Sequence, residues 1–256
     1  RRTRLCAHLT VSSLTPGIGE CCYPFAFDDS RHRSKTLAKA MTVVIAMPYP
    51  AVMAAKNEAK DPTGDRWRSP ARARMVQSAA TLIRERGIHG TGLREVVAHS
   101  GGPRGSLGRF FPGGKTQLVT EAIDVALVDL FGDLERTLSE AETFPEAISV
   151  IVTPWRRLLV DHDFALGCPL AATICDAADN DSLRTHVRDA FAGWRAPVVD
   201  AYARFGASPA EAEAHATVLM AALEGALILA RAQRSIEPLD TVERFFASRA
   251  PDPHRA

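Results

Sequence analysis

The sequence predicts an all-α protein, in which a three-helix helix-turn-helix domain precedes a larger helical bundle. Three observations lead to this prediction. Apolar residues recur at helical spacing from residue 69 almost to the C-terminus, and no stretch alternates as a strand would. Residues 91–115 hold two short segments separated by a glycine turn, which is the helix-turn-helix pattern. Residues 70–120 carry a net charge of +6, whereas residues 121–256 carry −10. A basic segment before an acidic body predicts a module that meets a polyanion.

The composition of the 256 residues is that of an ordinary soluble globular protein, and the formal net charge is +1. The five cysteines are an odd number spread thinly over a long chain. This distribution argues against a disulfide framework and for a reducing compartment, so the cytoplasm is the expected location. We expect no membrane partner, because no uninterrupted apolar run in the sequence reaches the length of a transmembrane helix.

Residues 1–68 show no sustained helical or strand period. An apolar run within residues 35–55 has the composition of a signal peptide, but it lies internally and contains Pro48 and Pro50. We therefore expect residues 1–68 to be a disordered or non-native N-terminal extension, since they lack the apolar pattern that offsets the entropy of ordering.

The first helix is predicted to begin at Ser69 and Pro70, an N-cap residue followed by a first-turn proline. Apolar residues from Met75 to Ile83 then recur at helical spacing, and Gly87 ends the helix. This helix can pack across the next two helices and complete a small three-helix core.

The next two helices share residues 91–115. Thr91 is the expected N-cap of the first, because its hydroxyl can accept a bond from a first-turn amide. The glycines after Ser100 provide the sharp turn, since glycine adopts a positive φ without steric penalty. Pro103 suits the first turn of the second helix, which is predicted to reach Phe110. That helix would carry Arg104 and Arg109, and a basic second helix fits the helix-turn-helix pattern for entering the major groove.

The motifs T-G-L-R-E-V-V-A-H-S-G, G-S-L and F-P-G-G-K within residues 91–115 resemble the DNA-binding domain of the TetR family of bacterial repressors. The resemblance extends over residues 69–246. The motifs at 167–171 (G-C-P-L-A) and 223–227 (L-E-G-A-L) are similar to those of the LmrA/YxaF-like subgroup.

The resemblance implies a DNA-binding domain over residues 69–115, with the helix that begins near Pro103 as the recognition helix. It implies that the DNA contacts are Thr91, Gly92, Arg104, Gly105, Ser106, Gly108, Arg109 and Lys115. Two positions depart from the family pattern, because Gly108 replaces a common aromatic residue and Gly102 replaces an apolar one. Glycine inside a short helix costs roughly 0.5–1 kcal/mol relative to alanine, so weakened DNA recognition is the alternative interpretation.

The body, residues 116–250, is predicted to be helical throughout. Its first helix should run from Lys115 to Leu138. Capping boxes at Thr143-x-x-Glu146 and Ser208-x-x-Glu211 predict the N-termini of two further helices. A helix capped by Asp181 or Ser182 should reach Tyr202, with a kink or break at Pro197. Helices over 209–233 and 238–249 complete the prediction.

By resemblance, the body is a ligand-binding and dimerisation domain that acts without a cofactor. The candidate ligand-binding residues are Trp155, Phe164, Cys168 and Trp194, which would line an apolar pocket for a small apolar or aromatic effector. For any one of these aromatic residues, simple core packing is the stronger alternative.

The leading hypothesis is a homodimeric, ligand-released repressor that binds a pseudo-palindromic operator. The alternative is a helical small-molecule-binding or partner-binding protein with weakened DNA recognition. A metal site at Asp161-His162-Asp163 is not expected, because three adjacent residues on a helix do not face one ion. Catalysis by Cys168 or His162 is not expected either, since no complete nucleophile–base motif accompanies them.

Overall fold

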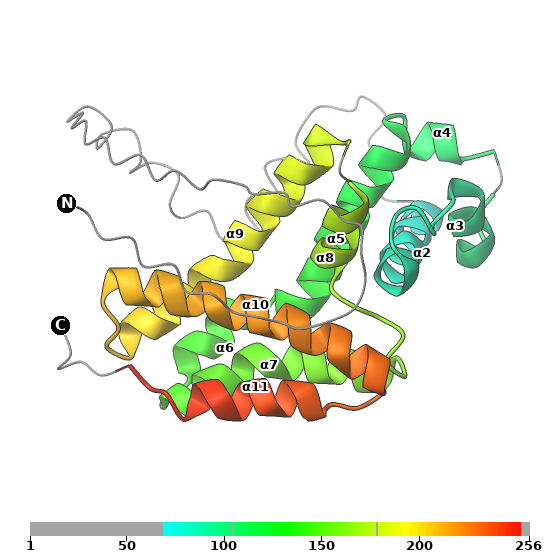
Figure 1. The fold of residues 1–256 in the computed structure, drawn as a ribbon. Coiled ribbons are helices and arrows are strands. Elements are labelled where there is room, and N and C mark those ends of the chain that lie inside the picture. The colour runs from blue at the N-terminus through cyan, green and yellow to red at the C-terminus, as the bar shows by residue number, and fades with distance from the viewer. Residues whose placement is uncertain (1–68, 104, 178, 252–256) are drawn as a thin grey trace, which may run out of the picture. The chain divides into compact units, whose positions relative to one another are not determined.

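A computed structural model describes residues 69–251 of the chain, except Arg104 and Ala178. Within these residues, every regular element is a helix, which confirms the predicted fold class (Figure 1). The expectation for residues 1–68 lies outside the described residues, as does the predicted role of Arg104. Three N-terminal helices, α2 to α4, form the part that we call the head, and α6 to α11 form the body; α5 contacts both.

The head is built on α2 (Pro70–Arg86), which packs on both α3 (Leu93–Ser100) and α5 (Gly114–Phe131). Met75 and Ile83 of α2 are fully buried, together with Val96 of α3. The helix ends as predicted at Gly87, whose φ of 77° lies in the region that favours glycine. An ion pair between Arg72 and Glu121, 2.6 Å apart, joins α2 to α5.

The helix boundaries within residues 91–110 differ from the prediction. Thr91 does not cap α3, because its hydroxyl donates to the Gly87 carbonyl oxygen (2.8 Å) and Gly92 occupies the N-cap. The second helix, α4, covers only Leu107–Phe110 and does not begin at Pro103. The Ser106 hydroxyl and amide both donate to the Pro103 carbonyl oxygen, at 2.7 and 3.1 Å. A serine side chain that satisfies a nearby carbonyl in this way competes with helix formation.

The body contains α6 (Leu134–Glu140), α7 (Phe144–Asp161), α8 (Pro169–Asp176), α9 (Asp181–Arg204), α10 (Pro209–Gln233) and α11 (Glu237–Ala247). The capping boxes at Thr143 and Ser208 are both formed, so the starts of α7 and α10 are confirmed. The N-cap of α9 is Asn180, which accepts a bond from the Leu183 amide (3.1 Å), and not Asp181 or Ser182 as predicted. The helix is not broken at Pro197, which lies inside it.

The predicted long helix from Lys115 to Leu138 is divided into α5 and α6. The division falls at Gly132 and Asp133, between Phe131 and Leu134. Glycine has low helix propensity, and Asp133 at the N-cap position of α6 makes no side-chain capping bond but pairs with Arg136 in the first turn. The apolar spacing continued across the break because both helices bury a face in the same core.

The body core centres on stacked aromatic side chains from three helices. Trp155 of α7 is fully buried and lies edge-on to Phe131, with ring centroids 5.2 Å apart. Phe131 in turn stacks on Trp194 of α9 at 5.0 Å. Aromatic pairs in these geometries add about 0.5–1.5 kcal/mol to the stabilisation from burial alone.

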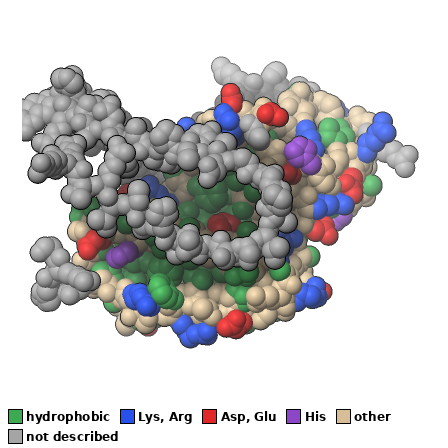
Figure 2. Space-filling view, in the orientation of Figure 1, with side chains coloured by type: hydrophobic (Ala, Val, Ile, Leu, Met, Phe, Trp, Pro, Cys, Tyr) green, Lys and Arg blue, Asp and Glu red, His purple; other side chains and the backbone are tan. Residues whose placement is uncertain are grey.

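Helix α10 buries one side against α7, α9 and α11 and leaves the opposite side apolar and exposed. The exposed side carries Val218, Ile228 and Leu229, between which lie Ala221 and Gly225. Figure 2 shows hydrophobic side chains gathered over α10 on this face. Within the described residues, α10 is the one helix long and apolar enough to cross a membrane, with a mean hydropathy of 1.4. A core helix that also meets a second protein has the same composition.

Candidate nucleic-acid interface and effector cavity

The N-terminal end of α3 is open on the surface of the head. Gly92 is exposed and occupies the N-cap, so the first amides of α3 lie at an accessible helix N-terminus. Such amides attract phosphate through direct hydrogen bonds and the helix dipole. Thr91 is 3% exposed, and its hydroxyl and amide are both bonded within the head. Its side chain therefore shapes the turn before α3, whereas Gly92 is presented outward.

The segment 105–109 places three predicted contact residues on the surface. Gly105, Gly108 and Arg109 are exposed, and a Cβ added at either glycine would have nothing within 4 Å. The Arg109 guanidinium lies over the Phe110 ring, 5.1 Å from its centroid, and Phe110 is buried in the head core. Ser106 is buried and bonded to Pro103. In the short α4, the buried Phe110 ring thus supports the exposed Arg109 side chain.

Lys115 connects the start of α5 to the turn between α2 and α3. Its ammonium group donates to the Ile88 carbonyl oxygen at 2.7 Å. This bond uses one of the three donors of the ammonium group, so the remaining donors stay free for a phosphate. It also holds the turn that carries His89 and Gly90 against the first turn of α5.

The departure at Gly102 has a steric explanation in the head core. A Cβ at this position would lie 2.3 Å from the terminal methyl carbon of Met75 and 3.1 Å from the Ser100 hydroxyl oxygen. Met75 is fully buried, so its side chain has little room to move aside. The Met75 side chain therefore occupies the space that an apolar side chain at position 102 would need.

The end of α2 is fastened to the body by hydrogen bonds to three separate segments. Arg84 and Gly167 bond reciprocally: the Gly167 amide donates to the Arg84 carbonyl oxygen (3.0 Å), and Arg84 Nε donates to the Gly167 carbonyl oxygen (3.4 Å). The Arg231 guanidinium of α10 donates to the Glu85 carbonyl oxygen at 3.0 Å. Asp176 of α8 accepts a bond from the His89 amide at 3.0 Å, and this bond lowers the pKa of the Asp176 carboxyl.

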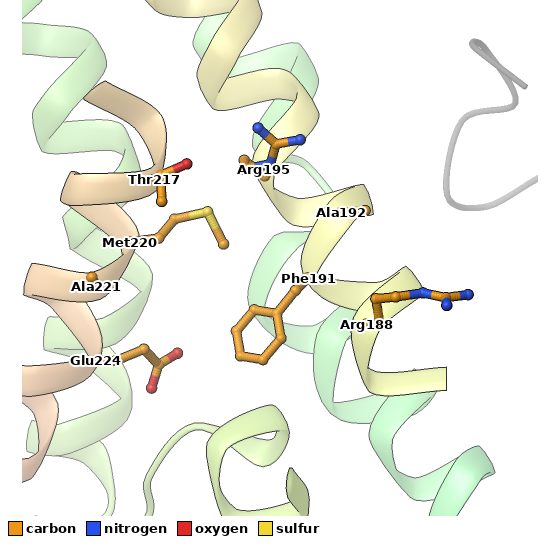
Figure 3. A pocket seen from close by; sticks show the side chains of 8 residues that line it. All are labelled: Arg188, Phe191, Ala192, Arg195, Thr217, Met220, Ala221 and Glu224. Carbon is orange, nitrogen blue, oxygen red and sulfur yellow. The ribbon is translucent and has the colours of Figure 1, made fainter. Parts of the chain in front are cut away.

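A cavity of about 450 Å³ lies between α9 and α10 (Figure 3). Its surface is largely apolar, with Phe191 and Ala192 from α9 and Met220 and Ala221 from α10. The polar lining residues are Thr217, Glu224, Arg188 and Arg195. A mostly apolar lining with a few polar groups suits a small apolar molecule.

The predicted ligand residues do not line this cavity. Trp155, Trp194 and Cys168 are each at most 4% exposed and contribute to the core, and Phe164 is half-buried in the loop after α7. Their positions favour core packing, which was the alternative interpretation. Sequence reasoning missed Glu224, although a signal was present: it is the one charged residue in the apolar run of residues 216–230.

A second hollow, of about 800 Å³, lies where the end of α5 meets α6 and α7. Its lining is mixed, with carboxylates from Asp129, Asp133 and Asp161 and guanidinium groups from Arg136 and Arg157. The mixed charges of this lining suit water and ion pairs, whereas the cavity between α9 and α10 suits an apolar molecule better.

Replacing Gly108 by tyrosine should strengthen DNA binding. The open space around Gly108 admits the ring, and the change removes the unfavourable helix propensity of glycine. The added hydroxyl can bond a backbone phosphate, worth about 1 kcal/mol. Together these effects predict roughly five- to thirtyfold tighter binding. Fluorescence anisotropy with the chain's own upstream DNA measures this, and weaker binding by a folded variant would show that DNA approaches Gly108 too closely for a side chain.

Comparisons with known proteins match the head and the body separately. The profile of the bacterial regulatory proteins of the tetR family matches residues 76–122. The profile of the C-terminal domain of LmrA/YxaF-like transcriptional regulators matches residues 145–245. An uncharacterised HTH-type transcriptional regulator of Mycobacterium tuberculosis is 38% identical over 180 residues, which cover 68% of this chain and 90% of that protein. The HTH-type transcriptional regulator LmrA of Bacillus subtilis is 27% identical over 170 residues, or 66% and 90% of the two chains.

Solved structures share the arrangement of helices. A TetR transcriptional regulator from Chloroflexus aurantiacus superposes with a TM-score of 0.59 at 26% identity, covering 70% of this chain and 92% of that one. A regulatory protein TetR from Rhodobacter sphaeroides gives a TM-score of 0.63 at 18% identity and covers 70% and 98% of the two chains, which shows the same fold. The relatives are regulators and not enzymes.

Proposed function

Since the chain belongs to the TetR family of DNA-binding transcriptional regulators, we propose that it is a repressor that binds a pseudo-palindromic operator as a homodimer and is released by a small effector. The observation that carries this proposal is that three consecutive helices supply the exposed N-terminus of α3, the exposed Arg109 of α4 and Lys115 of α5. Phosphates bind such a surface through backbone amides and cationic side chains. A regulator of this kind works where the chromosome is, which in a bacterium is the cytoplasm.

The exposed side of α10 supports the homodimer. Val218, Ile228 and Leu229 are each more than half exposed, and Gly225 between them has nothing within 4 Å of where its Cβ would stand. Small residues allow a second helix to approach closely, and large exposed apolar side chains mark an interaction surface. A two-fold dimer through this face buries the same patch on both protomers.

Release by an effector requires a ligand that binds the DNA-incompetent conformation more tightly, because a ligand with equal affinity for both states shifts nothing. Helix α5 is one lever in this proposal, since it packs on α2 in the head and on α7 and α9 in the body. The bonds of Arg84 to Gly167, of Arg231 to Glu85 and of His89 to Asp176 supply a second set of connections between the head and the body.

Binding to the upstream DNA should fall steeply with salt and depend on Arg109. Each neutralised phosphate adds roughly 0.9 to the slope of log K against log salt concentration, so Arg109→Ala should weaken binding and reduce the slope by about 1. Arg136→Ala removes an exposed arginine of α6 and should change neither quantity. Gel-shift titrations over a range of salt concentrations measure both. Equal affinity of the unmutated chain for upstream and random DNA would contradict the repressor proposal and favour a small-molecule-binding or partner-binding protein with weakened DNA recognition.

A further inference from the structure

Glu224 is half-buried and carries one buried oxygen that has no hydrogen-bond partner among the described residues. That oxygen, Oε1, is shielded from solvent. Burial raises the pKa of its carboxyl group. The Cys168 thiol hydrogen-bonds to Glu224, and burial together with this carboxyl raises the pKa of that thiol well above its usual range. In either ionisation state of Glu224, one oxygen remains able to accept a hydrogen bond.

The carboxyl group of Glu224 also lines the apolar cavity. Figure 3 shows the Glu224 carboxyl and the Phe191 ring projecting into the same gap between α10 and α9, with Met220 one turn from Glu224. A buried acceptor without a partner is unfavourable, so a molecule that supplies a donor here gains that bond in addition to the contacts of its apolar surface.

The two arginines of the cavity are engaged elsewhere. Arg188 pairs with Asp189 at 2.9 Å, and Figure 3 shows its side chain extending away from α10. Arg195 pairs with Glu213. Neither bonds to Glu224 Oε1, and the largely apolar surroundings favour a neutral donor over a charged one.

We propose that the effector is an aromatic molecule carrying a neutral hydrogen-bond donor, such as a hydroxyl group, which Glu224 accepts while the ring lies against Phe191 and Met220. The regulatory role of this molecule rests on the proposed function, whereas its binding at Glu224 does not. Glu224 touches Cys168, and the neighbouring Gly167 bonds to Arg84 of α2. A ligand at Glu224 is therefore connected to Arg84 of α2 through Cys168 and Gly167.

The test compares 1-naphthol, which carries a donor, with 1-methoxynaphthalene, in which a methyl group replaces the donor hydrogen. Isothermal titration calorimetry on the full chain should give roughly five- to tenfold tighter binding for 1-naphthol, as one hydrogen bond to a buried acceptor predicts. The Glu224→Ala variant should bind both probes equally, and Glu224→Gln should retain part of the preference through its carbonyl oxygen. Glu135→Ala, at an exposed position on α6, is the matched control and should keep the full preference.

Three results would overturn the inference: equal affinity of the unmutated chain for the two probes, a preference that persists in folded Glu224→Ala, or no binding of either probe at millimolar concentration. Circular dichroism checks that each variant is folded. A gel-shift assay in the presence of 1-naphthol measures release of the protein from DNA, independently of the binding titration. A donor preference without any effect on DNA would leave the site assignment intact and count against ligand-released repression alone.

Discussion

Replacing Gly225 by glutamate should leave the chain folded, convert it into monomers and lower operator binding by about 10²- to 10⁴-fold, the range by which two linked sites exceed one. In the single chain nothing lies within 4 Å of the new Cβ, and glutamate favours the helix by roughly 0.5–1 kcal/mol over glycine. In a dimer through α10, two carboxylates would meet in a closely packed apolar contact, where burying an unpaired charge is strongly unfavourable.

Multi-angle light scattering at micromolar concentration measures the dimer, and anisotropy measures operator binding. Ala203→Glu places the same charge at an exposed position of α9 and should remain dimeric. If Gly225 lies close to the two-fold axis, an equal mixture of Gly225→Glu and Gly225→Arg chains should recover dimers through charge pairing. A full dimer of Gly225→Glu alone would show that the protomers meet through a different face.

Replacing Trp155 by alanine should destabilise the chain by about 3–5 kcal/mol, as is typical for a fully buried aromatic side chain. The substitution opens a cavity and removes the contacts with Phe131 and Trp194, whose centroids lie 5.2 and 5.5 Å from that of Trp155. For a domain of this size the melting temperature should fall by roughly 10 °C.

Differential scanning calorimetry on Trp155→Ala and Trp155→Phe separates the effect of the cavity from the loss of the aromatic contacts. The indole nitrogens of both tryptophans are buried without a partner among the described residues, so phenylalanine removes an unmet donor and leaves only a small void. We expect it to cost much less than alanine, about 1 kcal/mol, since such swaps of similar shape are better tolerated. Unchanged stability of Trp155→Ala, with loss of 1-naphthol binding, would instead make Trp155 a ligand contact.

The features that the sequence predicted well are those set by neighbouring residues. The capping boxes at Thr143 and Ser208 depend on a contact three residues along the chain, and both are formed. The stop at Gly87 likewise follows from the local backbone. Such features need no knowledge of the tertiary fold.

The errors arise where a residue has a distant or competing partner. Thr91 was expected to cap α3, but its hydroxyl turns back to Gly87, and Ser106 similarly prefers Pro103. Periodicity also cannot show a helix break when both sides of the break face one core, as at Gly132. Glu224 meets Cys168 only because residues 56 positions apart in the chain are brought together by the packing of the body.

The contact between Gly102 and Met75 bears on how this family changes over time. The Met75 methyl group fills the space where a side chain at position 102 would stand, so the two positions share one fixed volume. A larger residue at position 102 therefore requires the Met75 methyl group to move or a shorter residue at position 75, and we expect relatives with the former change to carry the latter. The glycine that interrupts the family pattern in the turn is, by this reasoning, half of a compensated pair whose other half lies 27 residues earlier in α2.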